Sequence, residues 1–216
     1  MDFREHLKSL ELEISSRCTI GCMACPRNYQ SKDEWYSGFM DIDVLKDIVD
    51  NSNFDRYVFC GGYGDAIYHP KILEILEYML STNKMFFLET NGAHKPKRFW
   101  DELIELPWRQ GCGFIFSIDG LEDTNHIYRK NSDWDSIMYG VNTILSKPRR
   151  QRMRMKWKYL VFPYNEHQVE DARKFAMDLG FEEFDLIAKF FTFSTMSVTS
   201  SLTPFIEVNS CNTPSI

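Results

Sequence analysis

Apolar and polar residues follow two alternating periods along most of the chain. Stretches with the character of strands are followed by stretches with an apolar residue every three or four positions, which is typical of amphipathic helices. The predicted strands are residues 10–15, 56–62, 84–92, 113–120, 153–162 and 184–191. The predicted helices are residues 41–51, 69–81, 97–106, 134–145 and 166–180. This regular alternation predicts an α/β fold in which helices cover a parallel sheet.

The alternation is satisfied by an open doubly wound sheet and by a barrel, and periodicity alone does not choose between them. In both architectures the functional loops follow the carboxyl ends of the strands. The stretches that follow successive predicted strands are a cysteine-containing loop, GGYGD, TNG, DG and PYN. We therefore expect these loops to meet at one edge of the sheet and to form the site.

The fifth predicted strand separates basic residues from apolar ones. Its basic face carries Arg150, Arg152, Arg154, Lys156 and Lys158, and its apolar face carries Met153, Met155, Trp157 and Tyr159. The apolar face should pack under the helices and turn part of the basic face inward, where charges need partners. The candidate partners are Glu11, Glu13 and Glu89, and Lys158 is predicted to bind an anionic group of a ligand in the cavity. The alternatives are a solvated edge strand and, more weakly, a phosphate-binding surface for nucleic acid.

Size and charge narrow the class of protein. The 216 residues are 44% hydrophobic, which is enough for one sizeable core. The net charge of -6 argues against a nucleic-acid-binding domain, which is usually basic. The sequence shows no signal peptide and no apolar run near the roughly 20 residues that span a bilayer. We expect a soluble, cytoplasmic protein with a single domain and no membrane partner.

Three of the six cysteines, Cys18, Cys22 and Cys25, lie close together on the loop after the first strand. Without a secretion signal, such a group indicates metal ligation rather than disulfides. A structural zinc site takes four ligands, whereas a four-iron cluster held by three thiolates leaves one iron open for a small molecule. Gly21 gives the loop room to turn. The residues favour a cluster, with a zinc site completed by a distant ligand and inert thiols as the alternatives.

The spacing Cys18-x3-Cys22-x2-Cys25 resembles the cluster motif of the radical S-adenosylmethionine (radical SAM) superfamily. GGYGDAIYHP resembles the family's Gly-Gly-Glu-Pro segment, with Asp65 in the acidic position. TNG, FSIDG and DTNHIYR resemble stretches of family members that carry SPASM or Twitch extensions. The resemblance covers about residues 10–191.

The resemblance implies a partial (β/α)6 TIM-like barrel of parallel strands with outer helices over residues 1–195, followed by a short tail, 196–216. It implies one [4Fe-4S] cluster bound by Cys18, Cys22 and Cys25, with SAM on the open iron. An electron from an external donor of the flavodoxin or ferredoxin type would cleave SAM reductively. The resulting 5′-deoxyadenosyl radical would abstract hydrogen from a substrate. Oxygen sensitivity is also implied.

The residues carried over as SAM contacts are Gly61, Gly62, Asp65, Thr90, Asn91, Ser117, Asp119 and Arg129, with Lys158 added from the strand pattern. The glycines would allow close backbone approach, Asp65 would accept the SAM ammonium group, and Arg129 would pair with the SAM carboxylate. Two positions depart from the family. Ala24 stands where an aromatic residue often packs adenine, so that contact is expected elsewhere, and Ala66 replaces a common proline.

The sequence leaves the substrate open. Cys60 and Cys112 are expected to be small core residues, and only Cys211 lies beyond the sixth predicted strand, so no auxiliary cluster is predicted. A peptide or protein substrate is slightly favoured. The second hypothesis is an enzyme that acts on a small molecule or nucleotide, or that activates a partner's glycyl radical. A non-catalytic iron–sulfur or SAM-binding module is the third.

Overall fold

The computed structural model describes residues 9–29, 37–148 and 153–188, with the side chain of residue 188 excepted. One sheet contains β1 (Ser9–Leu12), β2 (Arg56–Phe59), β3 (Met85–Thr90), β4 (Gly113–Ser117), β5 (Arg154–Val161) and β6 (Glu183–Ala188). The strands lie side by side in sequence order, and each neighbouring pair is parallel. Residues 150, 152, 189–191, 196–216 and Cys211, which entered the sequence predictions, lie outside this description.

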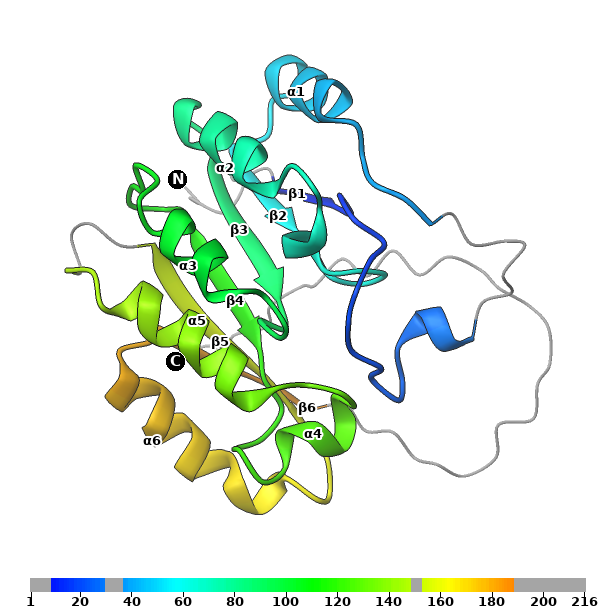
Figure 1. Ribbon diagram of the computed structural model, residues 1–216, viewed down its shortest axis with the longest axis vertical. Coiled ribbons are helices and arrows are strands. Elements are labelled where there is room, and N and C mark those ends of the chain that lie inside the picture. The colour runs from blue at the N-terminus through cyan, green and yellow to red at the C-terminus, as the bar shows by residue number, and fades with distance from the viewer. Residues whose placement is uncertain (1–8, 30–36, 149–152, 189–216) are drawn as a thin grey trace, which may run out of the picture.

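The strand order selects the barrel type over the doubly wound sheet. A doubly wound sheet reverses direction at a switch point, whereas here every crossover moves to the next strand in the same direction. Since such crossovers are right-handed, they place their helices on one face of the sheet. Figure 1 shows α2, α3, α5 and α6 together on one face of the curved sheet. The predicted partial (β/α)6 architecture is confirmed.

The predicted helices are all present. The α-helices are α1 (Ile42–Asn51), α2 (Ile72–Ser81), α3 (Lys97–Leu103), α4 (Asn125–Tyr128), α5 (Trp134–Leu145) and α6 (Val169–Leu179), and the short 3-10 turns are η2 (Pro26–Asn28), η3 (Ala66–Tyr68) and η4 (Glu166–Gln168). The sequence did not predict η2, η3 or α4, because a single turn is too short to show a period. None of the helices within the described ranges is long and apolar enough to cross a membrane.

The core lies between the sheet and these helices. Met153, Met155, Trp157 and Tyr159 are buried on the helix side of β5, as the strand pattern predicted. The alternative of an edge strand is wrong, because β5 lies between β4 and β6. Gly140 lets α5 approach α3 closely, since a Cβ atom there would lie 2.5 Å from the Trp100 ring.

Candidate functional site

The three clustered cysteines lie on the loop between β1 and η2, at the end of the sheet where the strands have their carboxyl ends (Figure 1). The loop is tied to the segment after α4, because the Gly21 amide donates to the Lys130 carbonyl at 2.9 Å and the Met23 amide to that of Tyr128 at 3.3 Å. Cys18, Cys22 and Cys25 are free, partly exposed thiols that line one cavity. The loop therefore presents three sulfurs to a common space.

The loop after β2 is held by the carboxylate of Glu13, the residue that directly follows β1. Glu13 Oε1 accepts the amide of Gly62 at 2.6 Å and that of Tyr63 at 3.1 Å. A Cβ atom at Gly62 would lie 2.8 Å from the same oxygen, so a larger residue there would displace the Glu13 carboxylate from the loop. This corrects the prediction that Glu13 is a partner of the basic strand face: it serves backbone amides instead.

Asp65 connects the loops after β2 and β3. The residue is 2% exposed, and its Oδ2 atom accepts the Thr90 hydroxyl at 2.9 Å, the Asn91 amide at 2.8 Å and the Asn91 side chain. Oδ1 accepts the Ile67 amide at 3.2 Å. Since a carboxylate oxygen offers two lone pairs, Oδ1 retains acceptor capacity for one further donor. Burial raises the pKa of Asp65 to about 6 despite these hydrogen bonds.

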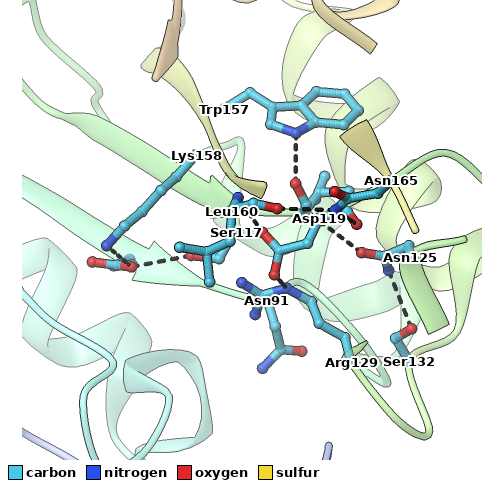
Figure 2. A network of polar contacts seen from close by, with 12 residues as sticks. Asn91, Ser117, Asp119, Asn125, Arg129, Ser132, Trp157, Lys158, Leu160 and Asn165 are labelled. Atoms are coloured by element: carbon cyan, nitrogen blue, oxygen red, sulfur yellow. Dashed lines mark hydrogen bonds and ion pairs between the residues drawn. The ribbon is translucent and has the colours of Figure 1, made fainter. Parts of the chain in front are cut away.

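Asp119 lies behind the cavity wall and is paired with Arg129. The Arg129 Nε atom lies 2.7 Å from Asp119 Oδ2, and the Leu160 amide donates to Oδ1 at 2.7 Å. Figure 2 shows the carboxylate between these two partners, with Asn165 donating to the Asp119 carbonyl at 2.8 Å. Burial raises the pKa of Asp119, and Arg129 opposes this rise. Asp119 therefore orients Arg129, whose side chain lines the cavity.

Lys158 lies on the inner side of the sheet, as the strand pattern predicted. Its Nζ atom is 2.7 Å from Glu89 Oε1, which also accepts the Ser117 hydroxyl at 3.0 Å (Figure 2). Glu89 is therefore the partner among the proposed acidic residues. Lys158 lines a wider neighbouring cavity of about 300 Å³ that reaches Cys22. It places a charged pair on the wall of that cavity.

The structure brings most of the predicted site together. The cavity that holds the three cysteines is also lined by Gly61, Asp65, Thr90, Asn91, Ser117 and Arg129. Gly62 and Lys158 line the wider cavity, together with Ala24 and Tyr128. Asp119 lines neither of the two. Cys112 is fully buried as expected, while Cys60 is partly exposed beside Glu13.

Sequence reasoning missed Arg27, which contacts the cysteine loop from η2. Its signal was the run CPRN, in which Pro26 favours a turn directly after Cys25 and brings the next side chain back toward the loop. It also missed the loop-holding role of Glu13, for which the sequence offers no signal beyond a charge at the end of a strand. Within the described ranges, no group of three or more His, Cys, Asp or Glu residues is gathered for a single metal ion. The three sulfurs instead surround a cavity, as ligands of a larger group do.

Comparison with known proteins decides the family. The family model described as the radical SAM superfamily matches residues 12–176. The chain belongs to the radical SAM superfamily. Radical SAM proteins use a [4Fe-4S] cluster held by three cysteines together with SAM, and the three thiols around one cavity fit that group.

One curated protein and two solved structures illustrate what this radical SAM chain is similar to. It is 29% identical over 125 residues to the tungsten-containing aldehyde ferredoxin oxidoreductase cofactor-modifying protein of Pyrococcus furiosus, a match covering 56% of this chain and 33% of the relative. It resembles anSMEcpe with bound AdoMet (SAM), with a TM-score of 0.63 and 18% identity over 84% of this chain and 51% of that one. It also resembles Streptococcus suis SuiB bound to precursor peptide SuiA, with a TM-score of 0.65 and 12% identity over 83% of this chain and 39% of that one. The chain thus spans about half or less of these relatives.

Proposed function

We propose that this chain is a radical SAM enzyme that cleaves SAM reductively and abstracts hydrogen from a peptide or protein substrate. The observation that carries the proposal is the single cavity lined by Cys18, Cys22 and Cys25 together with the buried carboxylate of Asp65. When bound, the cluster supplies the electron that cleaves SAM to the 5′-deoxyadenosyl radical. The protein binds, orients and shields these groups.

The described residues divide this work between them. Cys18, Cys22 and Cys25 hold the cluster, and the Gly61–Gly62 backbone gives SAM close access to it. Asp65 accepts a hydrogen bond from the SAM ammonium group through the remaining acceptor capacity of its Oδ1 atom. Arg129, oriented by Asp119, binds the SAM carboxylate.

The remaining polar residues that line the two cavities complete the proposed binding site. Thr90 and Asn91 form its rim beside Asp65, and Ser117 faces the ribose or the substrate. Lys158 belongs to the substrate side, because it lines the wider cavity. Asp119 stands behind the wall and acts through Arg129 rather than by direct contact.

Two features support a peptide or protein substrate: the likeness of the motifs to peptide-modifying members and the wider cavity beside the cysteines. A second candidate, a small molecule or cofactor, is favoured by the similarity to a protein named for cofactor modification. An external low-potential electron donor of the flavodoxin or ferredoxin type and a cytoplasmic location belong to the same proposal.

The test is anaerobic reconstitution with iron and sulfide, followed by incubation with SAM and dithionite. We expect a four-iron EPR signal that changes when SAM is added, and formation of 5′-deoxyadenosine. Transfer of deuterium from labelled peptides into 5′-deoxyadenosine then separates the peptide from the small-molecule reading. A cluster that ignores SAM and gives no 5′-deoxyadenosine would support the non-catalytic module instead.

The affinity for SAM should depend on pH through Asp65. Its carboxylate is the form that attracts the SAM ammonium group, and its pKa in the free protein is about 6. The affinity for SAM should therefore be constant above about pH 7. Below pH 6 it should decrease as the pH falls, and the decrease should approach about tenfold per pH unit. Calorimetric titration of SAM between pH 5 and 7 measures this. The Asp65→Asn variant should bind more weakly and show little pH dependence, and an equally steep profile in that variant would contradict the assignment.

Lys158 should matter for the substrate more than for SAM. The Lys158→Met variant should keep the SAM dissociation constant within about twofold and raise the KM for substrate by about tenfold, the loss of one charge-assisted hydrogen bond. Lys156→Met is the matched control, since Lys156 lies two residues earlier on the same face and pairs with Glu183 at 2.5 Å. Unchanged turnover and KM in Lys158→Met would remove this role.

A further inference from the structure

Arg27 is bound to the cysteine loop by all three nitrogens of its guanidinium group. Nη2 donates to the Ile20 carbonyl at 2.9 Å, and Nη1 donates to the Cys18 carbonyl at 3.5 Å. Nε donates to the sulfur of Cys25 at 3.4 Å. The side chain therefore spans the loop from its first cysteine to its last.

The local sequence explains why Arg27 reaches back. Pro26 opens the 3-10 turn η2, and the Tyr29 amide closes it by donating to the Pro26 carbonyl at 3.0 Å. The next side chain, Asn28, donates to the Cys22 carbonyl at 2.8 Å. This turn thus returns two successive polar side chains to the loop that they follow.

The Arg27 contacts have a redox consequence. A cysteine sulfur bound to an iron–sulfur cluster becomes richer in electrons when the cluster is reduced, so an N–H donor to that sulfur favours the reduced form. The fixed positive charge of the guanidinium group acts in the same direction. Cys18 receives a similar donor, because Asn91 Nδ2 lies 3.4 Å from its sulfur. Arg27 differs from Asn91 in adding a full charge.

We propose that Arg27 is a positioning residue that holds the three cysteines ready for the cluster and raises the reduction potential of the bound cluster. The inference rests on the proposed function. It identifies a charged residue of this chain that eases uptake of one electron from the donor. The planar guanidinium fork makes all three contacts at once, whereas a lysine ammonium group is a point charge that keeps the charge but does not reproduce three fixed directions.

The experiment is a redox titration of the reconstituted cluster without SAM, followed by EPR, for the wild type and for Arg27→Met, Arg27→Lys and Arg17→Met. Arg17→Met is the matched control. Arg17 directly precedes Cys18, and its guanidinium lies over the Phe39 ring at 5.6 Å. The Arg17→Met substitution therefore removes a charge beside the loop without removing a hydrogen-bond donor to a cysteine sulfur.

We expect Arg27→Met to shift the one-electron reduction equilibrium about tenfold toward the oxidised form, a fall in potential of about 59 mV. The reduction potential of Arg27→Lys should lie between those of Arg27→Met and the wild type. The reduction equilibrium of Arg17→Met should stay within about threefold of that of the wild type. Equal potentials in Arg27→Met and Arg17→Met would overturn the redox part.

Cluster assembly provides a second readout. Iron and sulfide uptake should be slower in Arg27→Met than in Arg17→Met, and equal uptake would overturn the positioning part. If Arg27→Met assembles no cluster while Arg17→Met does, the positioning role is supported. The redox role is then tested by comparing the reduction potential of Arg27→Lys with that of the wild type, and equal potentials would overturn it. Failure of the proposed function looks different: the wild-type cluster would titrate normally but give no response to SAM. A wild type that holds no cluster would overturn both.

Discussion

Replacing Cys18, Cys22 or Cys25 with alanine, one at a time, should abolish both the four-iron cluster and the formation of 5′-deoxyadenosine. In the proposed function each thiolate supplies one of three protein ligands of the cluster, and the three cysteines line one cavity. Two thiolates leave two irons without protein ligands. Iron and sulfide analysis and the EPR spectrum of the reduced protein measure the loss. Product formation should fall to the background level of the assay.

The matched control for these variants is Cys60→Ala. Cys60 is also a partly exposed cysteine at the carboxyl end of a strand, but it lies beside Glu13 rather than on the cysteine loop. This variant should keep the iron content and the EPR signal of the wild type. Loss of the cluster in Cys60→Ala, or its retention in one of the three loop variants, would contradict the assignment of ligands.

Removing the carboxylate of Asp119 should destabilise the protein by about 3–5 kcal/mol, because it leaves the Arg129 charge buried without its partner. The Leu160 amide would also lose its acceptor. Urea denaturation of the cluster-free Asp119→Ala variant measures the change in the free energy of unfolding. Affinity for SAM should fall as well, since Arg129 would no longer be oriented toward the cavity.

A surface ion pair provides the comparison. Lys147 lies 2.8 Å from Glu105, whose side chain is 69% exposed, so Glu105→Ala should cost less than about 1 kcal/mol. The double variant Asp119→Ala/Arg129→Met removes both buried charges and should be more stable than Asp119→Ala alone. A loss below about 1 kcal/mol in Asp119→Ala would show that Arg129 finds another partner or water.

Local sequence patterns predicted much of this molecule. The helix at Trp134–Leu145 has the predicted bounds, because its apolar residues keep one period from end to end. The cysteine spacing and the polar loops after successive strands predicted most of the cavity lining, since parallel strands bring their carboxyl ends to one edge. These features depend on residues close together in the chain, so their order in the sequence carries the information.

Only the tertiary structure decided the features that depend on residues far apart in the chain. Periodicity allowed a barrel or a doubly wound sheet; the family resemblance implied the barrel, and the strand order from β1 to β6 confirmed it. Glu13 was a candidate partner of the basic face of the fifth strand, but it accepts backbone amides some 50 residues later in the chain. Asp119, predicted as a SAM contact, is buried and paired with Arg129. A charge in a sequence shows only that a partner is needed; which donor is near enough to provide it is fixed when distant strands and loops are folded against each other.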